Sequence, residues 1–359
     1  MFWCKKCVTP STRPRIEFNE EEICNACQWH ERKQTEINWN DRIRQIANIC
    51  NQFRDKGYFD CIVPCSGGKD GSYVAWRLKH DFGMKPLCIT FMPQMQTRIG
   101  WLNLENFKSS GFDHITISPN PQTYQSFARD SFISKGMPKQ PFVTGISTAL
   151  LRYALMFNVK LVVYGEQGEV EYGGKKETET LQKFSRDFLI NTYYEGQDPS
   201  KYGYWWQVPE EKKFDDIYAT WWSLYEDWDP EIHARLAKNK CGFEMLVGGS
   251  IGTFTNYAQL DDTIQDLHAY LMYLKFGFGR CTSDASIEIR RGRLSRSEGV
   301  SLVNKLDGLF PVEYLDAYCD YFNMTEKEFF GVCDSFANRD LLERTDKPER
   351  PWILKNPCE

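Results

Sequence analysis

PCSGGKDGSYVAW, residues 64–76, places two adjacent glycines, a lysine, an aspartate and two serines within the space of one tight turn. The apolar run YFDCIVP (58–64) precedes this turn, and a helical pattern follows it. A strand, a glycine-rich turn and a helix in this order can bind an anion, because backbone N–H groups and the helix N-terminus point at the ligand. The stretch therefore predicts a phosphate site at the end of a buried strand.

The side chains of the turn suit a nucleotide phosphate and its metal ion. Lys69 adds a full positive charge, and Asp70 offers an oxygen, the ligand that Mg²⁺ prefers. A Walker A loop is excluded because an aspartate follows the lysine, and a dinucleotide fingerprint is excluded because two glycines are adjacent. A glycine-rich turn without a ligand is the alternative. The predicted phosphate-binding residues are Ser66, Gly67, Gly68, Lys69, Asp70, Gly71 and Ser72.

Apolar runs and helical patterns alternate around this turn. The sequence predicts strands at 59–64, 85–92, 114–119 and 159–165, and helices at 37–56, 70–82, 101–109 and 145–158. Such alternation is typical of an α/β fold with a doubly wound parallel sheet, whose ligands bind outside the carboxyl ends of the strands. A capping box, Thr325 with Glu328, marks one helix of a mostly helical C-terminal part.

These patterns divide the chain into four regions. Residues 1–33 form a small cysteine-bearing module, and residues 34–169 form the α/β domain that carries the phosphate-binding turn. Residues 170–256 are polar and aromatic, and we expect an insertion near the mouth of the site that contributes to substrate binding. Residues 257–359 form the helical C-terminal region.

The N-terminal module contains two cysteine pairs, Cys4-x-x-Cys7 and Cys24-x-x-Cys27, with sixteen residues between the pairs. Two such pairs can wrap one tetrahedral Zn²⁺ with four thiolates, which leaves no open position and makes the site structural. Iron–sulfur binding is the competing interpretation. A module of about 30 residues has too little core to fold unaided, so a bound metal would stabilise it.

Composition limits the kinds of partner and compartment. The net charge is −5 and the isoelectric point is about 5.7, which argues against wholesale binding to nucleic acid. No apolar run reaches about 18 residues, and the N-terminus lacks the apolar segment of a signal peptide. The thirteen cysteines fit metal ligation or burial in a reducing compartment, so we expect a cytoplasmic protein.

Five motifs together resemble one enzyme family. The turn resembles the SGGxDS loop of PP-loop ATP pyrophosphatases, although Gly71 stands where many relatives have serine. The four-cysteine N-terminus, this loop, GEQGEVEYGG (165–174), GTFTNYAQLDD (252–262) and HAYLMYLKFGFGRCTSDASIEIRRG (268–292) together resemble the N-acetyl sugar amidotransferases of bacterial surface-glycan pathways. Those enzymes act in the synthesis of O-antigen and of pseudaminic- or legionaminic-type sugars, and the resemblance covers nearly the whole chain.

The resemblance implies an AMP-forming reaction. ATP adenylates the oxygen of an acetamido group on an activated sugar, ammonia attacks the O-adenylyl imidate, and an acetamidino group remains as AMP leaves. Mg²⁺ and Lys69 would stabilise the departing pyrophosphate, and Asp70 would share the catalytic role. The resemblance also implies that Thr90 and Phe91, at the end of the second strand, lie beside the adenine, and that Gly165 takes part in ATP binding.

Further candidate residues follow the fourth strand, where an open sheet places its ligands. Glu166, Glu169 and Glu171 are candidates for binding Mg²⁺ or for acting as a general base, with Glu166 as the candidate catalytic residue. A solvated acidic loop is the alternative for each of them. Candidate substrate-binding residues are Glu169, Glu171, Tyr172, Asn256, Tyr257, Lys275 and Arg280, followed by Gly173, Gly174, Arg290 and Arg291.

Ammonia is expected to come from another protein, because no cysteine sits in a recognisable nucleophile setting and position 2 is phenylalanine. The resemblance implies a separate glutaminase, related to the one in histidine biosynthesis, with a barrel subunit as companion. Two other functions stay open: a tRNA-modifying enzyme of the same ATP class, and a non-catalytic zinc-bearing scaffold. Pyrophosphate release separates an enzyme from a scaffold, and a requirement for RNA identifies the tRNA enzyme.

Overall fold

Six strands form a central sheet in the computed structural model, which describes residues 1–174, 180–185, 189–190, 199–209 and 216–359. These strands are β1 (Cys61–Pro64), β2 (Pro86–Phe91), β3 (Asp113–Ile117), β4 (Leu161–Tyr164), β5 (Gln182–Lys183) and β6 (Tyr218–Trp221). Their order is β3-β2-β1-β4-β6-β5, and every neighbouring pair is parallel except β5 with β6. The predicted α/β fold with a parallel sheet is confirmed.

The four predicted strands correspond to β1, β2, β3 and β4. In contrast, β6 is not predicted, although it extends the sheet from within the region that we expect to be an insertion. Its sequence, YATW, is short and lies in a stretch crowded with aromatic and charged residues. A four-residue apolar run of this kind carries no periodicity that distinguishes a buried strand from other buried segments.

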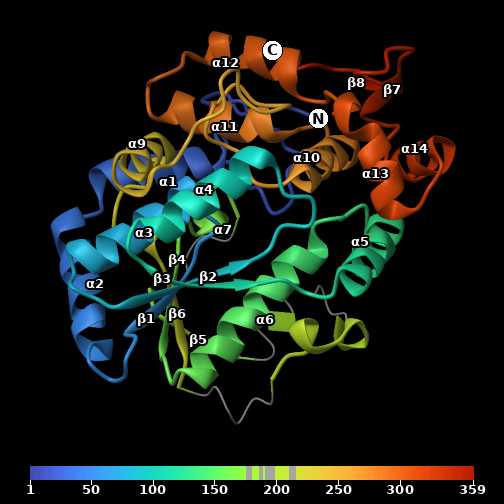
Figure 1. Cartoon of the computed structure of the whole chain (residues 1–359). Helices are drawn as coiled ribbons and strands as arrows, with labels where there is room; N and C mark the ends of the chain where they lie inside the picture. The colour runs from blue at the N-terminus through green and yellow to red at the C-terminus, as the bar shows by residue number, and fades with distance from the viewer. Residues whose placement is uncertain (175–179, 186–188, 191–198, 210–215) are drawn as a thin grey trace.

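Helices cover both faces of the sheet (Figure 1). The helices α3 (Lys69–His80) and α4 (Arg98–Ser109) lie on one side, and α6 (Gln140–Met156) lies on the other. The chain runs outward from β1 to β2 and β3, and then returns to place β4 on the opposite side of β1. This reversal creates a switch point between β1 and β4, and ligands of such sheets bind in the crevice outside the carboxyl ends of these strands.

One helix before β1 and one helix after β3 show how the local sequence sets the position of a helix. The predicted helix α2 (Trp39–Phe53) buries Ile46, Cys50 and Phe53 against the core of the sheet. The helix α5 (Pro121–Lys135) is not predicted, yet its start carries an ordinary signal. Asn120 accepts hydrogen bonds from the first turn, and Pro121 occupies the first helical position.

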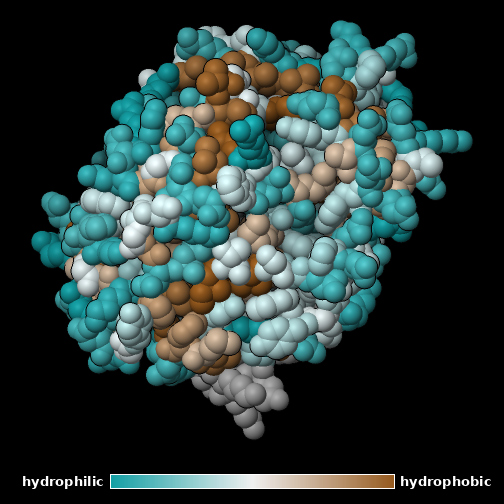
Figure 2. All heavy atoms as spheres, in the orientation of Figure 1, coloured by the Kyte–Doolittle hydropathy of each residue, from teal (hydrophilic) through white to brown (hydrophobic). Residues whose placement is uncertain are grey.

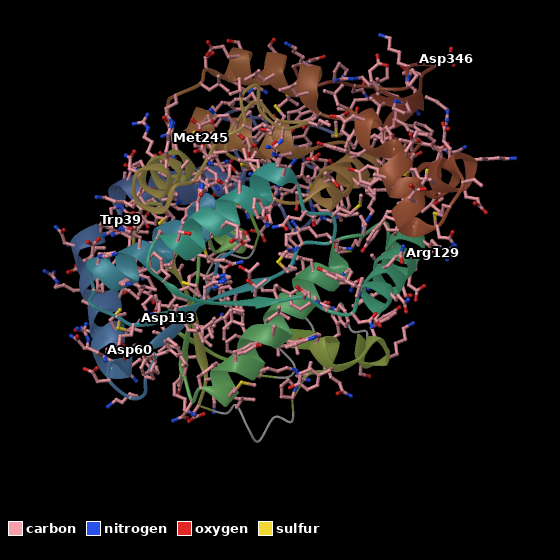
Figure 3. The ribbon with its side chains drawn as sticks, in the orientation of Figure 1. Trp39, Asp60, Asp113, Arg129, Met245 and Asp346 are labelled. Atoms are coloured by element: carbon pink, nitrogen blue, oxygen red, sulfur yellow. The ribbon has the colours of Figure 1, made fainter. Side chains whose placement is uncertain are left out.

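Asp60 fixes the start of β1. Its carboxylate, labelled in Figure 3, is buried and accepts hydrogen bonds from the backbone N–H of Asp55 at 2.7 Å and of Lys85 at 2.8 Å. A buried carboxylate needs such donors to offset its desolvation. Asp60 therefore joins the segment after α2 to the beginnings of β1 and β2, and so sets the register of the strand that ends at the phosphate-binding turn.

The C-terminal region is mostly helical, as predicted. Its elements are α10 (Thr263–Phe276), α11 (Arg280–Arg290), α12 (Arg296–Leu306), η5 (Val312–Tyr314), α13 (Leu315–Phe322), α14 (Glu326–Ser335), β7 (Leu342–Arg344) and β8 (Trp352–Leu354). The predicted capping box of Thr325 and Glu328 is confirmed at α14, and Ser295 with Glu298 forms a second one at α12. Each box satisfies two backbone donors that a helix end would leave unpaired.

The C-terminal helices pack against α5 (Figure 1). Arg129, labelled in Figure 3, donates from Nε to the carbonyl oxygen of Phe322 at 2.8 Å. Beside this bond, the rings of Phe132 and Phe322 stack with their centroids 4.7 Å apart. Because Phe322 also closes α13, these contacts join the C-terminal core to the α/β domain.

The N-terminal module packs against residues almost 300 positions away in the sequence. Its helix is α1 (Asn25–Thr35). The hydroxyls of Thr9 and Ser286 lie 3.1 Å apart, and Arg296 donates from Nε to the carbonyl oxygen of Cys7 at 3.2 Å. Figure 1 accordingly shows the N- and C-terminal ends of the chain in the same part of the molecule, above the sheet.

The remaining elements are α7 (Gly168–Glu171), η1 (Pro199–Tyr202), η2 (Tyr204–Trp206), η4 (Trp222–Leu224) and α9 (Pro230–Cys241). Among the described residues, no helix combines the length and the apolar character needed to cross a membrane. Figure 2 shows a mostly hydrophilic face with two apolar patches, one in the upper part near α11 and α12 and one lower down, over the sheet and α6.

The burial of Asp266 on α10 can be tested through the pH dependence of the free energy of unfolding. Burial, with the charge of Asp262, raises the pKa of Asp266 to about 8, whereas an aspartate in an unfolded chain has a pKa of about 3.9. The folded protein thus binds this proton more tightly, so the free energy of unfolding falls as the pH rises from about 4 to about 8. We expect Asp266→Asn to be more stable than the wild type at pH 8 and less dependent on pH.

Chemical denaturation between pH 5 and pH 9 measures this effect. Asp320→Asn, at an exposed position of α13, serves as the control and should leave the pH dependence of the wild type in place. An Asp266→Asn profile parallel to that of the wild type would show that Asp266 does not retain its proton in the folded protein.

Candidate active site

The phosphate-binding turn joins β1 to α3 at the carboxyl end of β1. Gly68 is the N-cap residue of α3 and no side chain caps this helix, so its first N–H groups are left for a ligand. Gly67 has a φ of 82°, and a Cβ there would lie 2.5 Å from the backbone nitrogen of Leu104 in α4. Only glycine fits both the backbone conformation and the space at this position.

Gly71 accounts for the difference from the SGGxDS pattern. It lies in the first turn of α3, where a Cβ would lie 2.7 Å from the carbonyl oxygen of Pro64 and 2.9 Å from Cα of Cys65. The close contact between α3 and β1 therefore excludes serine. The hydroxyl of Ser72 is fully buried and lies 3.8 Å from Sγ of Cys65, so it supports the turn from within the core.

Asp70 has one partner on each carboxylate oxygen. Lys69 Nζ contacts Oδ2, and His233 Nδ1 on α9 lies 3.0 Å from Oδ1. Burial by itself raises the pKa of Asp70, but the charge of Lys69 and the hydrogen bond from His233 outweigh it and hold this pKa below its ordinary value. Asp70 is therefore ionised at neutral pH and available to a cation.

Glu166 follows β4, on the other side of the switch point. Burial, with the charge of Asp70, raises the pKa of Glu166 to about 7. The next residue, Gln167, donates from its backbone nitrogen to the hydroxyl of Ser223 at 2.8 Å, which fixes the loop after the strand. A carboxyl group with this pKa exchanges its proton near neutral pH, as a general base requires.

These residues share one cavity of about 330 Å³. The cavity lies at the predicted edge of the sheet, outside the ends of β1 and β4. The structure brings the following predicted residues together in its lining: Ser66, Gly68, Lys69, Asp70, Gly71, Glu166, Tyr172, Tyr257 and Arg280. The roles of these residues in binding and catalysis stay predictions. The sheet, the turn and the C-terminal region meet at this cavity.

Other predicted residues lie elsewhere. Thr90 is buried and lies 2.8 Å from Nε2 of His114, and Phe91 is core, with its ring close to the backbone of Gly145. Lys275 donates to the carbonyl oxygen of Lys135 at 2.6 Å. The side chain of Glu169 lies outside the described part of the structure. Also outside the cavity lining are Gly67, Ser72, Gly165, Glu171, Gly173, Gly174, Asn256, Arg290 and Arg291.

Several cavity residues are not singled out by the sequence. Asp261 accepts a hydrogen bond from Ser66 at 3.2 Å, and Gln259 has a φ of 56°, which is rare outside glycine. Both belong to the motif GTFTNYAQLDD, so that motif could have pointed to them. Ala258 and Leu260 belong to the same motif. No motif of the sequence analysis contains the lining residues Gly100, Asn103, Lys139, Trp228, Pro230, Phe243 and Gln265, or His233, which contacts Asp70 behind the lining.

The cavity combines negative and positive groups. Lys69, Lys139 and Arg280 supply positive charge, and Arg280 pairs through Nε with Asp284 at 2.9 Å. Aromatic rings of Tyr172, Tyr257, Trp228 and Phe243 lie among them. Basic groups beside a helix N-terminus favour phosphates, and the carboxylates of Asp70 and Glu166 supply the oxygen ligands that Mg²⁺ prefers. The residues present therefore fit a nucleotide with a magnesium ion.

The four predicted cysteines of the N-terminal module do form one cluster. All four Sγ atoms lie within 4.8 Å of one another, with 3.7 Å between Cys7 and Cys24 and 4.0 Å between Cys4 and Cys27. A tetrahedral ion with Zn–S bonds of about 2.3 Å places its sulfurs about 3.8 Å apart. The spacing thus fits a single tetrahedral ion held by four thiolates, as predicted for zinc.

This module also holds the segment that follows Glu166. Lys33 Nζ lies 2.8 Å from the carboxylate of Glu171, and both side chains are buried. Asn25 donates from Nδ2 to the carbonyl oxygen of Gly174 at 2.8 Å. Gly173 has a φ of 88° and no room for a Cβ, which would lie 2.5 Å from Ile16. Glu171, Gly173 and Gly174 therefore connect the module to α7 and do not face the cavity.

Gly71→Ser tests the crowding between α3 and β1. We expect the extra atoms to overpack this contact and lower the free energy of unfolding by about 1–3 kcal/mol. Gly68→Ser is the matched control, because its Cβ would meet only Ser66 Oγ at 3.5 Å and serine is a favoured N-cap residue. Denaturant unfolding compares the two. Equal stability of both variants would contradict the close approach of Gly71 to Pro64.

Removal of the metal tests the cysteine cluster. Because α7 is held by this module, we expect chelation or Cys24→Ser to lower the melting temperature and to expose residues 166–174 to hydrogen exchange. Cys319→Ser, outside the cluster and partly exposed, should leave both unchanged. Elemental analysis of the purified protein should find zinc. Iron with acid-labile sulfide would show that the cysteines hold an iron–sulfur cluster instead of zinc. The absence of any metal would refute the proposed metal site.

Comparisons with known proteins give one family match and several distant structural similarities. No curated protein matches the chain. The family described as "LPS biosynthesis protein WbpG-like, C-terminal domain" matches residues 251–355.

Solved structures give distant similarities. NMN synthetase from Francisella tularensis is 18% identical, covers 36% of this chain and 54% of its own, and has a TM-score of 0.28. NH3-dependent NAD synthetase from Campylobacter jejuni is 16% identical over 38% of this chain and 62% of its own, with a TM-score of 0.29. U34-tRNA thiolase NcsA from Methanococcus maripaludis is 10% identical over 82% and 87% of the two chains, with a TM-score of 0.33.

The chain spans between about half and two thirds of the length of the two synthetases. None of the three similarities is close enough to assign an activity. Within the chain, residues 251–355 supply Tyr257, Asp261, Gln265 and Arg280 to the cavity at the phosphate-binding turn. Residues 251–355 therefore match the C-terminal domain of a WbpG-like family, and they meet the glycine-rich turn of the α/β domain at one cavity.

Proposed function

We propose that this protein is an ATP-dependent, AMP-forming amidotransferase that converts an acetamido group of a nucleotide-activated sugar to an acetamidino group. One observation carries the proposal: residues of the WbpG-like domain and residues of the PP-loop line the same cavity. Tyr257 and Arg280 come from the former, and Lys69 and Asp70 from the latter. A cavity of this kind lets a phosphate donor and a second substrate meet.

The first step transfers AMP to the substrate. The acetamido oxygen attacks the α-phosphorus of ATP, and a new P–O bond forms while the bond from this phosphorus to the α,β-bridging oxygen breaks. Pyrophosphate leaves, and the amide nitrogen loses its proton to give the imidate. The N–H groups at the start of α3 would hold the phosphates, and Lys69 would move from Asp70 to the departing pyrophosphate. Asp70 would hold Mg²⁺, which supplies charge neutralisation at the phosphates.

The second step uses the imidate made in the first. An amide is a poor electrophile, and its adenylated oxygen becomes a good leaving group. Ammonia attacks the imidate carbon, the C–O bond breaks, AMP leaves, and the nitrogen loses a proton. Glu166 is the proposed acceptor of this proton, because the pKa of its carboxyl is raised to about 7 and it lines the same cavity as Lys69.

The source of ammonia is part of the proposal. Of the thirteen cysteines, twelve are buried, and none lines the cavity in the described part of the chain. No cysteine of the described residues is therefore placed at this cavity to act as the nucleophile of glutamine hydrolysis. We propose that a separate glutaminase of the histidine-biosynthesis type, with its barrel companion, supplies ammonia in the cytoplasm. The product would enter lipopolysaccharide O-antigen or nonulosonic acid synthesis.

A product assay tests this function. The protein is incubated with ATP, Mg²⁺, ammonium and a panel of nucleotide-activated diacetamido sugars, and mass spectrometry follows the products. We expect AMP together with a sugar whose mass falls by the difference between an oxygen and an imino group. AMP without a changed sugar would refute this substrate class. Turnover that requires tRNA would establish an RNA-modifying enzyme in its place.

Glu166→Gln separates the two steps. If Glu166 accepts the proton in the second step, pyrophosphate release in a single turnover should persist while amidine formation slows by about 10²–10⁴-fold. Lys69→Met is the matched variant, because it should slow pyrophosphate release itself. Equal loss of both steps in Glu166→Gln would place Glu166 in metal binding and remove it as the base.

A further inference from the structure

We propose that His233 is a positioning residue that fixes one oxygen of Asp70, so that the other oxygen is presented to the magnesium ion of ATP. The inference rests on the proposed ATP-dependent chemistry and deepens it. His233 lies outside every motif of the sequence analysis and comes from α9, more than 160 positions after the phosphate-binding turn.

The imidazole of His233 packs against two aromatic rings. Its side chain is buried, and its ring centroid lies 4.1 Å from that of Tyr73 and 4.1 Å from that of Trp228. The rings leave Nδ1 pointing at Asp70 Oδ1, at 3.0 Å. Because the ionised Asp70 can only accept, Nδ1 carries the proton and donates it to Oδ1. His233 therefore contributes one directed hydrogen bond that side-chain rotation cannot easily break.

The residues around this ring are themselves fixed. The hydroxyl of Tyr73 donates to Glu226 at 2.9 Å and accepts from Arg77 at 2.6 Å. Before α9, Asp229 caps the helix and pairs with Arg293 at 2.7 Å. These partners belong to α3, the segment before α9 and the segment after α11. The position of His233 is thus determined by several elements and not by a flexible loop.

The two partners of Asp70 differ in how easily they can leave. Lys69 has a long side chain, and its amine lies 5.7 Å from the ring centroid of Tyr257, inside the cavity. It can therefore move from Oδ2 to a phosphate without disturbing the fold. The buried ring of His233 cannot make the same movement. Asp70 Oδ1 therefore keeps its hydrogen bond to His233, while Oδ2 becomes available to the metal. Such outer partners orient ligating carboxylates and raise metal affinity.

Three substitutions separate this role from simple packing. His233→Asn can place its amide nitrogen near the position of Nδ1, whereas His233→Gln places it near Nε2, and His233→Leu has no donor. Calorimetry measures ATP binding with and without Mg²⁺, in the absence of sugar and ammonium. We expect the apparent affinity for Mg²⁺ to fall about 10- to 100-fold in the Leu and Gln variants and to recover in the Asn variant.

The controls distinguish the possible outcomes. Melting temperatures without ATP and Mg²⁺ report the cost to packing, and ATP binding without Mg²⁺ should stay close to the wild type in all three variants. Equal Mg²⁺ dependence in the Asn and Gln variants, or equal loss with and without Mg²⁺, would overturn the positioning role. If the His233→Leu variant does not fold, the comparison of the Asn variant with the Gln variant still tests the positioning role of His233.

The same measurements keep the two proposals apart. A wild-type protein that binds ATP with Mg²⁺ but converts no sugar would refute the amidotransferase and leave the role of His233 intact. A wild-type protein that binds no ATP would overturn both proposals.

Discussion

The candidate site depends on one steric constraint: the chain turns from β1 into α3 where there is no room for side chains. Gly67 passes against α4 and Gly71 against the end of β1, at distances that a Cβ would reduce below van der Waals contact. This close packing aims the first N–H groups of α3 at the cavity and sets Lys69 and Asp70 on its first turn. Every other cavity residue is placed relative to this turn.

The second half of the cavity comes from distant parts of the chain. Asp261 reaches Ser66 from a segment before α10, and Arg280 enters from the first turn of α11. Buried ion pairs, such as Lys33 with Glu171 and Asp227, hold α7 and the loop before α9 around it. Removing one partner of such a pair leaves an unpaired buried charge, which is far costlier than the pair is stabilising. These pairs therefore specify one arrangement of the cavity wall.

Local patterns were sufficient for the phosphate-binding turn, the cysteine cluster and the four predicted strands, because each depends on neighbours in the sequence. They were not sufficient for His233 and Lys139, which reach the site only through the packing of α9 on α3 and of α6 on the sheet. Glu171 and Lys275 show the converse. Both lie in motifs near the site, yet their position on the helix turns them toward Lys33 and the carbonyl of Lys135.

The contacts of the N-terminal module have a consequence for synthesis of the chain. Cys7 and Thr9 leave the ribosome long before their partners Arg296 and Ser286 are made, because 289 and 277 positions separate them. Contacts of such long sequence separation form late and slow folding. During translation, the four cysteines are therefore present before the C-terminal helices that pack against them have been made. A chain that stops short would leave these thiols and the apolar side of α11 exposed to oxidation and to chaperones.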